Sequence, residues 1–245
     1  MPMPIIEIGF DFEWEVRNWY NTIFSKARYG LRKTGSSWGL GGIPEEIPSM
    51  LEGVSKEEAF GRIRQKLTAE IGRPEVATLI KDSIERARKR WDDVAEKFFV
   101  ALSSMLDIPM QQFEPAYHAY FTLSTRAPFE KNDFMFNKNL DFGDAAMHEI
   151  MHIEFLKAYD GYCAEQGLNE EQIAHLKEIL TVLLNEDVRD LLTRLEPGYM
   201  KHVRLREQVL DMYRKQGGKD GNFKEFLSQV ILLVKGFDFS GGSQK

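Results

Sequence analysis

Cysteine is almost absent from this sequence: among 245 residues there is one, Cys163. A lone cysteine cannot form a disulfide within the chain, so a disulfide-stapled fold is excluded and a reducing compartment is favoured. Its neighbours, in DGYCAEQG, show no evident pattern that would activate a thiol as a nucleophile. We therefore expect a cytoplasmic protein that does not use cysteine chemistry.

Long hydrophobic runs are missing as well. The longest apolar run near the C-terminus, VILLV at 230–234, is far too short to span a bilayer. The N-terminal stretch MPMPIIEIGFDFEWEV lacks the basic start and the long apolar core of a signal peptide. These absences predict a chain without a membrane span or a secretory leader.

An excess of positive charge is the third thing that the sequence lacks. There are 32 basic residues against 38 acidic ones, and the formal net charge is −6. A general affinity for nucleic acid or for an anionic membrane is therefore not expected. The one basic cluster is RARKR at 86–90, which we interpret as a solvated helix face, with a phosphate-binding patch as the alternative.

Helical periodicity, by contrast, is abundant in the first half of the chain. The spacing of apolar residues predicts helices over about 14–30, 55–72 and 74–106. Ser55 followed by Glu58 is typical of a capping box, and Pro74 is well suited to open a helix. The Gly-rich stretch TGSSWGLGGIPEEIP has no phosphate-loop spacing, so it is expected to be a surface loop.

The composition changes in the middle of the chain. AYHAYFTLST (116–125) is rich in aromatic and β-branched residues and predicts a strand, and DFMFN (133–137) predicts a second one after the turn APFEKN. Helices are expected to follow at about 144–159, 173–195, 199–216 and 222–235, with Asp144 as an N-cap and a linker at 160–172. The order predicts an α+β fold, predominantly helical, with a small antiparallel sheet.

Two of the five histidines stand four residues apart in HEIMH, at His148 and His152, and Glu149 follows the first. Positions i and i+4 share one face of a helix, so both imidazoles can bind one ion. A zinc ion lowers the pKa of a bound water toward ~7, and Glu149 is placed to accept the proton. The motif therefore predicts a Zn²⁺ site. The alternative is that the histidines are core residues bonded to backbone carbonyls.

The stretch AYHAYFTLST…DFMFN…DAAMHEIMHIEF resembles the zincin metallopeptidases, in which a helix bearing HExxH follows a small sheet. The resemblance covers about residues 115–190. It implies a sheet packed beside the HExxH helix, an edge strand that binds extended substrate, and a third metal ligand from a later segment. Glu154 departs from the family pattern, which has an apolar residue there, and no HxxGxxH follows, so the metzincin form is excluded.

This resemblance also sets the expected organisation of the chain. We expect a helical N-terminal part at 1–110, a zincin-like metal-binding core at 111–196 and C-terminal helices at 197–245. The composition shows no boundary sharp enough for two independent domains, so these parts are expected to form one compact domain overall.

The third ligand is expected to be a glutamate on the next helix, as in the gluzincin variant, because no third histidine has a useful spacing. Three protein ligands leave one position open for water. Glu178 belongs to a polar stripe with His175 and Asn185 on an otherwise apolar helix. Glu186 copies the spacing of the gluzincin NExxxD signature, with Asp190 at the position that braces a ligand histidine. We favour Glu178 and keep Glu186 as the alternative.

Together these residues predict a zinc-dependent metallopeptidase-like hydrolase that acts on a peptide or protein substrate, with Glu149 as general base. The strand predicted at 117–125 is expected to hold the peptide by strand addition. Tyr199 and His202 are candidates for stabilising an oxyanion. The alternative is a non-catalytic helical interaction protein in which HEIMH is a structural metal site or plain core.

Overall fold

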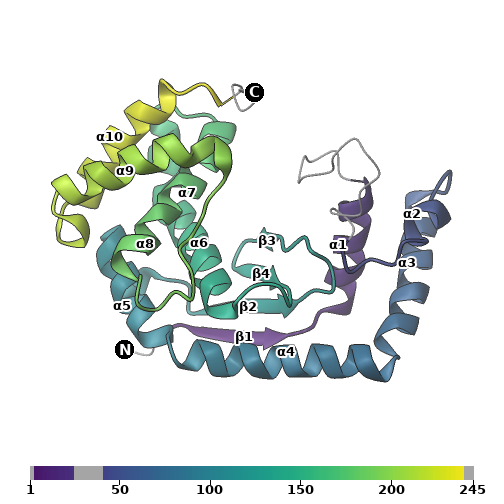
Figure 1. Cartoon of the computed structure of the whole chain (residues 1–245). Coiled ribbons are helices and arrows are strands. Elements are labelled where there is room, and N and C mark those ends of the chain that lie inside the picture. Colours follow the sequence, from purple (N-terminus) through teal and green to yellow (C-terminus); the bar gives the residue numbers. More distant parts are fainter. Residues whose placement is uncertain (1–2, 25–40, 240–245) are drawn as a thin grey trace. The chain divides into compact units, whose positions relative to one another are not determined.

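The computed structural model of the chain describes residues 3–24 and 41–239 (Figure 1). The chain divides into two compact units. Unit 1 comprises Met1–Ile5, Trp91–Pro115 and Gly143–Lys245, and unit 2 comprises Ile6–Arg90 and Ala116–Phe142. The division at about residues 110 and 196, and the single compact domain, stay predictions.

The described chain is mostly helical with one small sheet, which confirms the α+β, predominantly helical class. The helices of unit 2 are α1 (Phe12–Phe24), α2 (Ile47–Met50), α3 (Lys56–Ile71) and α4 (Pro74–Asp92). Ser55 caps α3 by accepting a hydrogen bond from the Glu58 amide at 3.1 Å, and Pro74 is the first residue of α4, as predicted. Within residues 3–24 and 41–239, no helix combines the length and the apolar character that a membrane span needs.

The core of unit 2 lies where α1 packs against α3. Its buried side chains are Val16, Trp19, Ile43, Ile47, Leu51, Ala59, Ile63 and Leu67. The predicted end of the first helix at about residue 30, and the Gly-rich stretch as far as residue 40, lie outside the described residues. The part of that stretch that is described forms a turn and leads into α2.

The sheet consists of β1 (Ile5–Gly9), β2 (Ala116–Phe121), β3 (Phe129–Glu130) and β4 (Asp133–Phe136), in the order β1-β2-β4-β3. β2 and β4 are parallel, with His118 opposite Asp133, whereas β3 and β4 are antiparallel. The predicted antiparallel sheet was therefore wrong, and the sheet is mixed. The reason is β3: this two-residue strand lies inside the predicted turn and forms the hairpin with β4.

Two further expectations about β2 were also wrong. The strand ends at Phe121 rather than at residue 125, because the Thr122 hydroxyl accepts the Ser124 amide at 3.0 Å and turns the chain away. β2 also lies between β1 and β4, so both of its edges are already paired. An interior strand cannot bind a peptide by strand addition.

Unit 1 contains α5 (Ala95–Leu106), α6 (Phe142–Glu165, of which Phe142 belongs to unit 2), α7 (Glu170–Leu180), α8 (Leu184–Asp187), α9 (Val203–Lys215) and α10 (Phe223–Lys235). α7 contacts α9 and α10, and α9 contacts α10 (Figure 1). The two C-terminal helices were predicted to within a few residues. The helix predicted over 74–106 is divided into α4 and α5.

The boundaries of α6 and α7 differ from the prediction. Asp144 is not the N-cap of α6, because the helix already begins at Phe142. Its carboxylate accepts hydrogen bonds from the amide and the hydroxyl of Thr193, at 2.9 and 2.5 Å. α6 also continues through half of the expected linker, to Glu165. The predicted 173–195 helix ends at Leu180 and passes through a 3₁₀ turn at Thr181–Leu183 into α8. These helices carry the candidate site.

Candidate metal centre

α6 and α7 bring His148, His152 and Glu178 together in unit 1. His148 and His152 stand one turn apart on α6, with ring centroids separated by 4.3 Å. Glu178 Oε2 lies 3.7 Å from His148 Nε2 and 3.3 Å from His152 Nε2. One potential ligand atom from each of the three residues lies within 4.8 Å of the others. The described parts of the chain hold no other group of three His, Cys, Asp or Glu side chains so placed.

Local sequence explains why both helices form and why they bury these groups. α7 begins with a capping box between Asn169 and Gln172. α6 is apolar around most of its circumference, and its buried apolar residues include Ala146, Met147, Ile150, Met151, Ile153 and Phe155. The side chain of His152 is only 1% exposed, whereas those of His148 and Glu178 are 20% and 17% exposed. The three polar groups therefore lie at the edge of an apolar core, with His152 on the inner side.

The two oxygens of Glu178 have separate partners. Oε1 accepts a hydrogen bond from Lys177 Nζ at 2.5 Å, and Oε2 faces the two histidines. Burial alone would raise the pKa of Glu178, but the hydrogen bond with His152 and the positive charges of Lys177 and His148 outweigh it, so the pKa is lowered. Glu178 is thus held as a carboxylate that presents one oxygen to the imidazoles.

The histidines themselves differ in their electrostatics. Burial lowers the pKa of His152 to about 3, and the charge of His148 acts in the same direction. Burial would also lower the pKa of His148, but its hydrogen bond with Glu196 and the surrounding carboxylates raise it instead. His152 is therefore neutral near pH 7, and a neutral imidazole can bind a cation without first releasing a proton.

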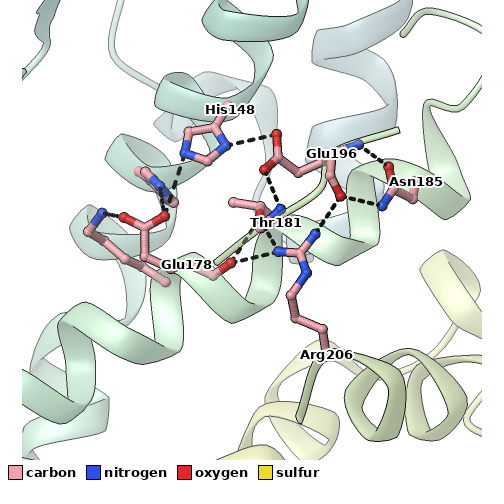
Figure 2. Close-up of polar contacts among 9 residues, drawn as sticks. His148, Glu178, Thr181, Asn185, Glu196 and Arg206 are labelled. Atoms are coloured by element: carbon pink, nitrogen blue, oxygen red, sulfur yellow. Dashed lines mark hydrogen bonds and ion pairs between the residues drawn. The ribbon is translucent and has the colours of Figure 1, made fainter. Parts of the chain in front are cut away.

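Glu196 was not foreseen as part of this site. Its Oε2 lies 3.2 Å from Nδ1 of His148, so the other ring nitrogen, Nε2, remains on the side of Glu178 (Figure 2). This is the place that the NExxxD spacing assigned to Asp190, which is exposed instead. Glu196 follows the end of the helical pattern, directly before Pro197-Gly198, where no periodicity indicates the direction of a side chain.

Glu149 lies beside the histidines on α6. Its Oε2 is buried and accepts no hydrogen bond from any residue that the structure describes. Burial raises the pKa of Glu149, against the opposing charges of His148 and Lys177. A buried carboxylate oxygen without a protein donor requires a water or another polar partner. Two imidazoles, one carboxylate and such a base are the residue types that a catalytic zinc site needs, so the residues present fit the ion.

Glu186, the alternative third ligand, is elsewhere. Its carboxylate pairs with Arg214 of α9, with Arg214 Nη2 at 2.6 Å, and this pair is largely exposed. That hydrogen bond lowers the pKa of Glu186. The geometry therefore favours Glu178 over Glu186 as the residue that accompanies the two histidines.

The two oxyanion candidates lie next to each other. The His202 ring is buried, and its Nε2 is 3.1 Å from Nδ1 of His175. Tyr199 is 45% exposed and packs edge-on against His202. His202 is therefore already engaged by His175, and its role at an oxyanion stays a prediction.

Two residues singled out in the sequence have structural roles. Glu154, the departure from the zincin pattern, is buried, and its Oε1 accepts the Glu114 amide at 2.9 Å. Cys163 is buried, and burial raises the pKa of its thiol to about 12, which disfavours a thiolate.

Comparisons with protein families, with curated proteins and with solved structures found no match to this chain. The case for a function therefore rests on the motif and on the arrangement of the residues around it.

Proposed function

We propose that this protein is a zinc-dependent hydrolase of the metallopeptidase type, with a gluzincin-like His-His-Glu centre. The observation that carries the proposal is the convergence of His148, His152 and Glu178 from two helices, with ligand atoms within 4.8 Å of one another. Glu149, on the same helix as the histidines, supplies the second element that hydrolysis needs. A carboxylate from a second helix that faces both histidines is the arrangement that a His-His-Glu centre requires.

His148 and His152 would hold the ion through nitrogen, and Glu178 through Oε2. Three protein ligands leave a position for water or substrate, which distinguishes a catalytic zinc site from a structural site closed by four. When bound, zinc would lower the pKa of water and polarise the carbonyl of the substrate. Lys177 keeps the other Glu178 oxygen engaged, which favours a single Glu178 ligand atom.

Glu149 would act as the general base and then as the general acid. It takes a proton from the attacking water as the new C–O bond forms at the amide carbon. It then delivers that proton to the leaving nitrogen as the C–N bond breaks, and returns to its ionised form. The buried position that raises the pKa of Glu149 suits this role, because a carboxylate of higher pKa is the stronger base.

A zincin-like core is part of this proposal. Its support is the sequence order of a small sheet followed by an HExxH helix, together with the third potential ligand, Glu178, on the following helix. The sheet belongs to unit 2 and the metal-binding residues to unit 1, so the support comes from the centre rather than from sheet packing. The expected substrate class is a peptide or protein amide.

The test is Glu149→Gln, compared with the wild type for zinc affinity and for cleavage of a peptide library. The variant should keep the affinity and lose cleavage by about 10²–10⁴-fold, because the ligands remain and the base is gone. Glu186→Gln, an equally conservative change in an exposed ion pair, should retain both. Normal cleavage by Glu149→Gln would rule out this mechanism.

A further inference from the structure

Arg206 is a buried arginine whose hydrogen bonds lead to the candidate centre. It comes from α9, and only 4% of the residue is exposed. One terminal nitrogen, Nη1, donates to the backbone carbonyl of Glu178 at 2.8 Å and to the Thr181 hydroxyl at 2.6 Å. The other, Nη2, donates to the backbone carbonyl of Glu196 at 2.9 Å (Figure 2). One guanidinium thus joins the residue that faces both histidines to the residue that contacts His148.

A buried charge destabilises a protein unless hydrogen bonds compensate for its lost hydration, so the acceptors of the Arg206 guanidinium indicate what this side chain holds in place. Burial lowers the pKa of Arg206, although the carboxylates of Glu196 and Glu178 oppose this. The guanidinium is planar and rigid, so donating to carbonyls in two segments fixes their separation and orientation. The two segments are the end of α7 and the irregular chain around Glu196.

The chain around Glu196 is held from a second side by Asn185. The Asn185 side chain accepts the Glu196 amide at 2.7 Å and donates to the Glu196 carbonyl at 3.0 Å. Gly198 closes the arrangement: its amide donates to Glu196 Oε1 at 3.1 Å, and its φ is +63°. A Cβ at Gly198 would lie 2.6 Å from Nε of Arg206, so the close approach of the guanidinium requires glycine.

These contacts leave Glu196 Oε2 for His148 Nδ1. A hydrogen bond at one ring nitrogen determines which nitrogen is available to a metal and how the ring is oriented. We propose that Glu196 and Arg206 are positioning residues of the metal centre: Glu196 holds His148 with Nε2 toward the ion, and Arg206 holds Glu196 and the Glu178 backbone in register. This inference rests on the proposed zinc site and deepens it, since it assigns helix α9 a part in metal affinity.

The experiment is a zinc titration of the full chain against a competing chromophoric chelator, for the wild type, Glu196→Ala, Arg206→Met and the double variant. Each single change should weaken zinc binding by about 10–100-fold, the usual effect of removing an outer partner of a metal ligand. The double variant should lose less than the product of the two losses, because both residues act on one segment. Glu196→Gln, which retains an acceptor for Nδ1–H, should recover most of the affinity.

The matched control is Arg214→Met. Arg214 lies on the same helix, but it is exposed and pairs with the carboxylate of Glu186. Its zinc affinity should equal that of the wild type. If Arg206→Met does not fold by circular dichroism, Arg206→Lys replaces it, because lysine keeps the charge and loses the planar fork.

The outcomes separate the two proposals. Zinc binding by the wild type that is equally tight in Glu196→Ala and in the Arg206 variant overturns the positioning roles and leaves the zinc site standing. Fully multiplicative losses overturn the coupling between Arg206 and Glu196. A wild type that binds no zinc overturns the proposed function, and the positioning roles with it.

Discussion

Unit 1 contains two pairs of histidines, and the difference between them shows what makes a metal centre. His148 and His152 share Glu178 as a neighbour, and Glu196 contacts His148. The other pair, His175 and His202, is hydrogen-bonded ring to ring at 3.1 Å. Both pairs are largely buried, so burial alone does not distinguish them.

The surroundings of the second pair are mainly aromatic and basic, and the carboxylate of Glu171, 3.8 Å from His175 Nε2, is 85% exposed. The ring of Phe239 stacks on His175 with centroids 4.0 Å apart. Burial lowers the pKa of His202 to about 4, and the charges of His175 and Lys201 add to this. Burial lowers the pKa of His175 as well, and the positive charge of Lys201 lowers it further. Both rings are therefore neutral near pH 7, and one can donate to the other.

The first pair has a largely buried carboxylate, that of Glu178, which faces both rings, whereas the carboxylate of Glu171 beside the second pair is exposed and contacts one ring. A cation placed between His148 and His152 meets the largely buried carboxylate of Glu178, whereas one placed beside His175 and His202 meets the positive charges of Lys201 and Arg206 as well as carboxylates. The helix α7 contributes to both pairs, since His175 and Glu178 lie one turn apart on it. A pair of buried histidines thus becomes a candidate metal site through the acid that faces it.

The largest expected difference is in zinc affinity, when the two histidine pairs are removed in turn. His148→Ala with His152→Ala should weaken zinc binding by at least about a thousandfold, roughly 4 kcal/mol, because two of three ligands are lost. His175→Ala with His202→Ala should change the affinity by less than about threefold. Isothermal titration with zinc measures both. Equal losses in the two double variants would remove the distinction between the pairs.

A smaller effect should separate the two glutamates. Glu178→Gln replaces the anionic ligand by a neutral amide, and we expect about a hundredfold weaker zinc binding, equivalent to roughly 2.7 kcal/mol. Glu186→Gln only breaks an exposed ion pair with Arg214, so zinc binding should be unaffected and the free energy of unfolding should change by less than about 1 kcal/mol. A competition titration decides, and a stronger effect at Glu186 would reverse our choice of ligand.

The smallest effect concerns pH and the second pair. The pKa of His202 is lowered to about 4 in the folded protein, against 6.5 for an unperturbed histidine. Below pH 6.5 the unfolded chain binds a proton that the folded chain refuses, so this residue makes the folded state less stable as the pH falls toward 4. In metal-free protein, His202→Asn should reduce that loss of stability by on the order of 2 kcal/mol. Urea unfolding at pH 6.5 and pH 4.5 tests it, and parallel curves for both proteins would show that His202 is not the source.

Much of the centre could be inferred from sequence because its parts lie on regular helices. The i, i+4 spacing placed His148 and His152 on one face, and the polar stripe on an apolar helix indicated Glu178. The sequence pattern did not indicate Glu196, because this residue follows the last helical turn and its direction depends on contacts from Asn185 and Arg206. Such contacts join residues that no local pattern connects.

The fold class and most of the helices could be predicted from the sequence. The prediction failed where short-range signals are ambiguous. β3 has only two residues, too few for an alternating pattern, yet it determines the direction of β4 and makes the sheet mixed. The linker predicted at 160–172 contains Gly161, but the structure has this residue within α6. A single glycine costs a helix about 1 kcal/mol, which the packing of a long helix easily offsets.

The most direct measurement is anomalous X-ray diffraction at the zinc absorption edge from crystals grown with zinc. Our account predicts one strong peak bonded to the side chains of His148, His152 and Glu178, at roughly 2.0–2.2 Å, with a fourth position that no protein atom fills. A peak enclosed by four protein ligands would indicate a structural site and contradict the hydrolase. Zinc bound elsewhere, or no peak at these residues, would contradict the metal centre itself.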